Sequence, residues 1–162
     1  HDVGDLLAIA DREMEGLAAS RDVRLVRHVD CPAQVLADHD RIVQSLTNLV
    51  GNAIKFSPPG SVVELDARLV GGDVEIQVRD QGRGIPADRL DTIFDRFVQV
   101  DSSDMRREGG SGLGLAICRG IVERHGGRVW LESEVGVGTT AYLCLRAAPE
   151  PVAVGGPTAA SG

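Results

Sequence analysis

The sequence SVVELDARLVGGDVEIQVRDQGRGIP (Ser61 to Pro86) decides which fold this chain can adopt. Apolar and polar residues alternate through Ser61–Val70 and again through Asp73–Arg79, which is typical of strands with one buried face. Gly71 and Gly72 stand between the two stretches, as in a tight hairpin turn. We therefore predict an antiparallel hairpin whose second strand runs directly into a glycine-rich turn.

The end of that second strand carries a candidate nucleotide site. Asp80 precedes Gly82 and Gly84, so a carboxylate stands beside glycines that let a ligand approach the backbone closely. Such a carboxylate can accept a hydrogen bond from an exocyclic amine, such as that of adenine. The plainer alternative is an ordinary turn, because Asp and Gly are common turn residues. A dinucleotide-binding Gly-x-Gly-x-x-Ala fingerprint ending at Ala87 is a weak match, because Pro86 lies inside it and no second strand of a βαβ unit follows within the needed span.

Upstream, NLVGNAIKF (Asn48 to Phe56) carries polar residues at helical spacing. Asn48, Asn52 and Lys55 stand at i, i+4 and i+7, on one stripe of a helix. Amide oxygens can ligate a hard cation, and an ammonium can neutralise phosphate. Lys55 is the single lysine among 17 basic residues, which indicates a role for a flexible point charge unless the composition simply favours arginine. The segment therefore predicts contacts with Mg²⁺ and phosphate.

Downstream, GGSGLGLAI (Gly109 to Ile117) is a glycine run that leads into an apolar helix. Backbone N–H groups at a helix N-terminus, with the positive end of the helix dipole, suit phosphate oxygens. A flexible linker is the alternative, but these glycines open the helix directly, which favours the phosphate site. A P-loop is excluded, because the chain contains no Gly-Lys pair.

The remaining pattern completes an α/β fold. Asp38 or Asp40 caps the helix that ends near Phe56, where the sequence SPPG (Ser57 to Gly60) stops it. We predict a two-layer α/β sandwich with a mixed, mostly antiparallel sheet and helices packed on one face. The other expected elements are helices at 5–20, 86–97 and 112–125, strands at 23–29, 34–37, 128–132 and 139–146, and a loop at 98–111.

Composition limits the possible functions. The net charge of −7 argues against a protein that binds nucleic acid through a basic face. Cys31, Cys118 and Cys144 lack metal-ligand spacing and are expected to be buried thiols of a reducing compartment. No apolar run reaches the roughly 18–20 residues that span a membrane, so we expect a cytoplasmic location.

The two ends of the chain carry expectations of their own. Residues 147–162 are rich in Pro, Gly, Ala and Ser and are predicted to form a disordered tail or linker, which leaves residues 1–146 as one domain. Because the chain begins at His1 rather than methionine, we expect it to come from a larger parent protein, which could itself be membrane-anchored.

Five segments in order carry a resemblance to a known family: NLVGNAIKF, DQGRGIP, IFDRFVQVD, GGSGLGLAI and GVGTTAYL. They resemble the ATP-binding catalytic domain of bacterial sensor histidine kinases. These belong to the gyrase–Hsp90–kinase–MutL superfamily, which has the Bergerat ATP-binding fold. The resemblance covers about Arg41 to Leu145, with a leading helix and strand before it. It implies that the domain at residues 1–146 binds Mg²⁺–ATP and transfers the γ-phosphoryl group to a histidine on a separate dimerisation domain, as part of two-component signalling.

The resemblance also implies roles for particular residues. Asn52 would ligate Mg²⁺, Asn48 would lie beside the triphosphate, and Lys55 would contact phosphate. Asp80 would bind the adenine amine, helped by Gly84 and by Thr139 through water. The base pocket would be walled by Phe56, Ile85, Ile93 and Leu115, with Gly82 and Gly84 in its floor. Phe94 and Phe97 match the F box, Val98 begins the ATP lid, and the phosphates would be held by Gly110, Ser111, Gly112, Leu113 and Gly114.

Two departures from the family pattern affect these assignments. Many members carry an arginine where this chain has Gln99, so Arg96, Arg106 and Arg107 are the candidates to supply that charge. The residues assigned to catalysis are Asn48, Lys55, Arg96 and Gln99. No histidine lies in a phosphoacceptor motif, so the acceptor is expected on helices of the parent outside this chain. The chain alone is then expected to be a monomer with little turnover, and its parent a homodimer that also engages a response regulator.

Two other functions are weighed against the kinase. Superfamily members that hydrolyse ATP have a glutamate at the position of Asn48, and an amide is a poor general base, which disfavours a hydrolase. A degenerate nucleotide-sensing or partner-docking module is the second alternative. The intact Asn52, Asp80 and glycine segments weigh against it.

Overall fold

The computed structural model describes residues 1–29, 33–90, 93–94 and 114–149. In this part of the chain five strands form one sheet in the order β1-β2-β3-β5-β4. β1 pairs with β2 in parallel, and every other neighbouring pair is antiparallel. The strands are β1 (Arg24–Val29), β2 (Val62–Val70), β3 (Asp73–Arg79), β4 (Arg128–Glu134) and β5 (Gly138–Arg146). The prediction of a mixed, mostly antiparallel sheet is confirmed.

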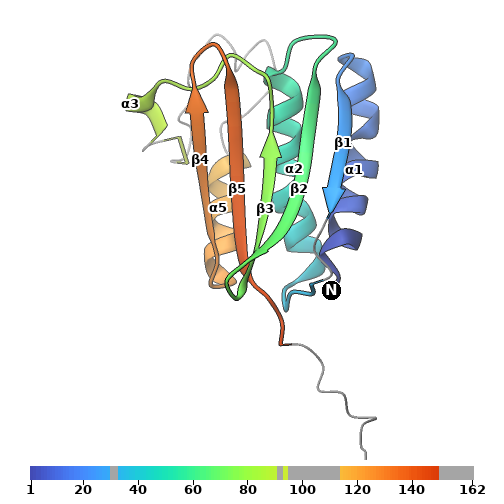
Figure 1. Cartoon of the computed structure of the whole chain (residues 1–162), viewed down its shortest axis with the longest axis vertical. Helices are drawn as coiled ribbons and strands as arrows, with labels where there is room; N and C mark the ends of the chain where they lie inside the picture. The colour runs from blue at the N-terminus through green and yellow to red at the C-terminus, as the bar shows by residue number, and fades with distance from the viewer. Residues whose placement is uncertain (30–32, 91–92, 95–113, 150–162) are drawn as a thin grey trace, which may run out of the picture.

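Three helices pack on one face of this sheet, α1 (Val3–Ser20), α2 (His39–Phe56) and α5 (Gly114–Arg124) (Figure 1). A single short turn of helix, α3 (Ala87–Leu90), lies beyond the β4 edge (Figure 1). The core between the two layers contains the apolar stripe of α2, including Ile42 and Leu46, and the inward residues of the strands, including Leu65 and Ile76. The predicted two-layer sandwich is therefore confirmed.

The helix α2 has the boundaries that its sequence indicates. Asp38 is the N-cap residue, and its carboxylate accepts a hydrogen bond from the Arg41 N–H at 3.2 Å. Asp40, the other candidate cap, lies in the first turn. The helix ends at Phe56, directly before the two prolines. This cap and this stop leave Asn48, Asn52 and Lys55 away from the buried stripe, each half-buried.

One predicted strand does not form, and one predicted helix is described only in part. Residues 34–37 form no strand; instead Gln34 bridges Asp2, and Val35 bridges Ala147. The segment contacts the residues before α1 at one point and the residue after β5 at another, so it does not lie along one partner strand. Within the predicted helix 86–97, the structure describes helix only at Ala87–Leu90, with residues 93 and 94 in a turn.

The described chain continues slightly past the predicted domain boundary at residue 146. Ala147 donates its N–H to Gly72 O at 3.1 Å, and Ala148 donates to Gln34 O at 2.6 Å. Residues 150–162, most of the predicted tail, lie outside the described part of the chain. Cys118 and Cys144 are buried free thiols, as predicted, whereas Cys31 lies outside the described residues. Burial raises the pKa of Cys118 to about 12, so this thiol is unreactive at neutral pH.

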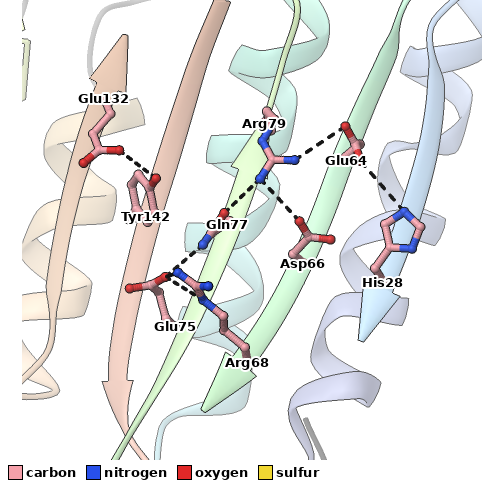
Figure 2. A network of polar contacts seen from close by, with 9 residues as sticks. All are labelled: His28, Glu64, Asp66, Arg68, Glu75, Gln77, Arg79, Glu132 and Tyr142. Carbon is pink, nitrogen blue, oxygen red and sulfur yellow. Dashed lines mark hydrogen bonds and ion pairs between the residues drawn. The ribbon is translucent and has the colours of Figure 1, made fainter. Parts of the chain in front are cut away.

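The other face of the sheet is covered by paired polar side chains rather than by helices (Figure 2). Arg79 donates to Gln77 at 3.1 Å and forms ion pairs with Glu64 and Asp66. Burial raises the pKa of Glu75, but hydrogen bonds from Gln77 and Arg68 outweigh it and leave that pKa below its usual value. Among the described helices, none is long and apolar enough to cross a membrane.

Candidate functional site

The predicted site residues that the structure describes gather mainly at one end of the sheet. β3 ends there with Arg79, β5 begins there with Gly138, and the C-terminal half of α2 lies behind them (Figure 1). α2 and α5 pack against each other, and Asn48 of α2 donates a hydrogen bond from Nδ2 to the carbonyl oxygen of Gly114 at 3.2 Å. The fold therefore brings the three sequence segments around residues 48–56, 80–85 and 114 together.

Asp80 holds its carboxylate in a fixed orientation at this end. Its Oδ1 accepts hydrogen bonds from the backbone N–H groups of Gly82 at 2.8 Å and Thr139 at 3.1 Å. Its Oδ2 accepts no hydrogen bond from any described residue. Burial raises the pKa of Asp80 above its ordinary value, although the two backbone N–H groups oppose the shift. One carboxylate oxygen is thus committed to the fold, and the other is available to a ligand.

Gly82 and Gly84 are required by close approaches on either side of that carboxylate. A Cβ at Gly82 would lie 2.5 Å from the carbonyl oxygen of Phe56, at the end of α2. A Cβ at Gly84 would overlap the carbonyl group of Glu134, and Gly84 also has φ +79°. Both glycines therefore keep the loop after β3 closely packed against α2 and β4.

We expect Gly84→Ala to destabilise the domain by roughly 3 kcal/mol, combining a left-handed backbone with a steric clash. Gly71→Ala is the matched control, because Gly71 has φ +62° but open space around its Cβ position. It should cost only about 1–2 kcal/mol. Urea unfolding of both variants measures the two costs. Equal destabilisation would show that the contact with Glu134 is unimportant.

The loop after Asp80 is also held by a residue that the sequence interpretation missed. Ser133 of β4 accepts a hydrogen bond from the Ile85 N–H at 2.7 Å. Its Oγ also lies 2.8 Å from Thr139 Oγ1, because Ser133 and Thr139 are partners in the register of β4 and β5. A serine in a strand carries no local signal for such a role. Only the hairpin register, read together with Asp80, could have indicated it.

The polar stripe of α2 lies on one side of the helix, as predicted, and its three side chains differ in their hydrogen bonding. Asn48 donates a hydrogen bond from its Nδ2 to Gly114, which fixes the orientation of its amide. The side chains of Asn52 and Lys55 form no hydrogen bond or ion pair within the described ranges, although both are half-buried. An amide oxygen and an ammonium are thus available to a ligand on the α2 side of the site.

The residues predicted to wall the base pocket differ in their exposure. Phe56 is 40% exposed, and the guanidinium of Arg83 lies 5.3 Å from its ring centroid. Ile85 is half-buried, and Leu115 packs against the core. Ile93 is buried in the turn after α3, as is its neighbour Phe94.

The remaining predicted site residues lie outside the part of the chain that the structure describes, so their roles stay predictions. They are Arg96, Phe97, Val98, Gln99, Arg106, Arg107, Gly110, Ser111, Gly112 and Leu113.

Comparison with known proteins identifies the class to which this fold and site belong. The chain belongs to the histidine kinase-, DNA gyrase B- and HSP90-like ATPase family, whose sequence model matches residues 37–149. Within that family it is an ATP-binding catalytic domain of the sensor histidine kinase type, as predicted.

Two curated relatives illustrate this assignment. The chain is 35% identical over 150 residues to the sensor-like histidine kinase SenX3 of Mycolicibacterium smegmatis, an alignment that covers 93% of this chain and 39% of that protein. It is 39% identical over 132 residues to the sensor histidine kinase WalK of Bacillus subtilis, covering 80% of this chain and 22% of that protein. The chain therefore spans well under half the length of these relatives.

Solved structures agree with the relatives. The mycobacterial sensor histidine kinase MprB superposes with a TM-score of 0.78 at 30% identity, covering 92% of this chain and 97% of that one. Full-length ShkA in complex with AMPPNP gives a TM-score of 0.80 at 33% identity, covering 91% of this chain and 30% of that one.

Proposed function

We propose that this domain binds Mg²⁺–ATP and transfers its γ-phosphoryl group to a histidine on a separate dimerisation domain of the parent protein. In that step an imidazole nitrogen forms a bond to the γ-phosphorus, the bond from that phosphorus to the β,γ-bridging oxygen breaks, and ADP leaves. The observation that carries the proposal is Asp80, whose Oδ1 is held by two backbone N–H groups while Oδ2 remains available to a base.

Adenine recognition follows from the chemistry of that oxygen. A carboxylate oxygen accepts hydrogen bonds only, and adenine presents an amine donor where guanine presents a carbonyl acceptor. The fixed orientation of Asp80 means that little ordering is required when the base binds. The phosphates would then extend toward α2 and the start of α5, where Lys55 supplies a positive charge.

The donor set on α2 fits Mg²⁺. The described residues contain no group of three or more His, Cys, Asp or Glu side chains that could hold a metal by themselves. Mg²⁺ in nucleotide sites is held by one or two protein oxygens, by phosphates and by water, so it does not need such a group. The half-buried Asn52 amide, with no partner among the described residues, is the oxygen that would hold it. When bound, Mg²⁺ would neutralise charge on the phosphates.

The state of Asn48 supports transfer to a protein rather than to water. Its amide has no useful pKa for activating water, and its NH₂ group is already bound to the Gly114 carbonyl. Catalysis then consists of positioning and charge neutralisation, because the neutral imidazole of the acceptor is itself nucleophilic. In this proposal the parent is a homodimer in the cytoplasm or anchored to a membrane, and a response regulator receives the phosphoryl group.

Titration calorimetry of this chain with non-hydrolysable ATP and GTP analogues, with and without Mg²⁺, tests the proposal. We expect adenine-selective binding that Mg²⁺ strengthens. Adding a dimerisation domain with an acceptor histidine should then yield an acid-labile phosphohistidine from ATP. Absence of nucleotide binding under every condition would instead favour a degenerate partner-docking module.

A further inference from the structure

The Ser133 hydroxyl joins β4, β5 and the loop that follows Asp80. Its Oγ accepts the Ile85 N–H at 2.7 Å, lies 3.1 Å from the Gly138 carbonyl oxygen, and lies 2.8 Å from Thr139 Oγ1. Ser133 is half-buried, so water competes only partly for these contacts. One hydroxyl therefore has three partners within hydrogen-bonding distance.

The hydrogen-bonding capacity of a hydroxyl decides where the protons lie. Ser133 has one proton and two lone pairs. The Gly138 carbonyl can only accept, so the Ser133 proton must point to it if that contact is a hydrogen bond. The two lone pairs then accept from the Ile85 N–H and from the Thr139 hydroxyl. The opposite assignment, with Ser133 donating to Thr139, would set two oxygens 3.1 Å apart with no proton between them.

This arrangement determines what Thr139 offers to a ligand. Because the Thr139 proton is committed to Ser133, its hydroxyl can only accept further hydrogen bonds. The N–H of the same residue holds Asp80 Oδ1 at 3.1 Å, so Thr139 is a direct neighbour of the carboxylate. Asp80 and Thr139 together then present acceptors and no side-chain donor.

We propose that Ser133 is a positioning residue that sets the base selectivity of this site by holding Thr139 as an acceptor. The inference rests on the proposed nucleotide-binding function, and in it Ser133 acts on the base through Thr139. An all-acceptor pair matches a base edge that carries an amine with two protons. It opposes a base whose carbonyl oxygen would occupy the same place.

Ser133→Ala tests the proposal, because it frees the Thr139 hydroxyl to rotate and donate. We expect the ratio of ATP-analogue to GTP-analogue affinity to fall about 10-fold, measured by competition against a fluorescent ATP analogue in the presence of Mg²⁺. Ser133→Thr, which keeps the hydroxyl, should restore most of the ratio. Ser20→Ala removes an exposed serine of α1 and should change neither affinity.

A double-mutant cycle separates this role from a merely structural one. In a Thr139→Val background, Ser133→Ala should leave the ratio unchanged, because no hydroxyl remains to be oriented. An equal loss of affinity for both bases in Ser133→Ala would overturn the proposal and indicate a general loosening of the loop at Ile85. A full fall in the affinity ratio when Ser133→Ala is made in the Thr139→Val background would also overturn the proposal.

Nucleotide binding by the unsubstituted chain distinguishes a failure of the proposed function from a failure of the proposed role of Ser133. If it binds neither nucleotide, the proposed function fails and this inference fails with it. If it is adenine-selective and Ser133→Ala keeps the full ratio, only the role of Ser133 is wrong. Thermal unfolding of each variant confirms that it is folded at the temperature of the titration.

Discussion

Replacing Asp80 with asparagine should lower the affinity for an ATP analogue about 100-fold, equivalent to losing a charged hydrogen bond. Both backbone N–H groups point at Oδ1, so the asparagine must keep its carbonyl oxygen there to accept them. Its NH₂ group then takes the place of Oδ2. A donor replaces the acceptor, so it opposes the adenine amine and suits the carbonyl oxygen of guanine. Affinity for the GTP analogue should therefore rise relative to that for the ATP analogue.

Two further variants make this result specific. Asp80→Ala removes both oxygens and should weaken ATP binding without any gain for guanine. Asp40→Asn is the matched control, because the Asp40 side chain is 96% exposed in the first turn of α2 and should leave both affinities unchanged. Calorimetry with both analogues is the measurement. Unchanged affinities for both bases in Asp80→Asn would remove Asp80 from the base site.

Asn52→Ala should abolish the strengthening of ATP binding by Mg²⁺ and reduce phosphoryl transfer to an acceptor domain by about 100-fold or more. The physical reason is that the Asn52 amide has no partner among the described residues and can turn its oxygen to a cation, whereas Asn48 is oriented by the hydrogen bond from its Nδ2 to Gly114. Binding of the nucleotide without Mg²⁺ should change little. The measurement is calorimetry with and without Mg²⁺, followed by radiolabel transfer from ATP.

The controls for Asn52 use the same helix. Gln44→Ala removes an amide two turns away, whose oxygen accepts from Arg41, and should keep the Mg²⁺ dependence. Asn52→Asp keeps an oxygen ligand and should retain part of the Mg²⁺ effect, despite repulsion between its charge and the phosphates. If Asn52→Ala responds to Mg²⁺ like the unsubstituted chain, the metal is held elsewhere.

Local patterns were sufficient to predict most of the elements. The helix α2 has a capping Asp38, an apolar stripe at helical spacing and a Ser-Pro-Pro stop, and its bounds agree with the structure. The hairpin of β2 and β3 follows from two alternating stretches around Gly71 and Gly72, and Val70 pairs with Asp73 as a tight turn requires. These features depend on residues close together in the chain.

Segments whose conformation depends on distant partners were predicted less well. Residues 34–37 contain apolar side chains typical of a strand, but Val35 exchanges hydrogen bonds with His1 and bridges Ala147, so the segment follows no single partner strand. The helix expected from residue 86 is described only through Ala87–Leu90. For residues 34–37 the pattern of side chains was too short to decide between conformations that tertiary contacts separate, and residues 91–92 and 95–97 lie outside the described part of the chain.

The sequence by itself determined which chemical groups the site would contain: a carboxylate after a strand, glycines beside it, and two amides and an ammonium on one helical stripe. Those are local properties, since the spacing along one strand or one helix dictates which side chains share a face. Only the tertiary structure decided which of these groups contact one another. The antiparallel pairing of β5 with β3 brings the Thr139 N–H to Asp80, and the packing of α5 on α2 brings Gly114 to Asn48. The register of β4 on β5 places Ser133 beside Thr139, because pairing between strands distant in sequence depends on the whole core.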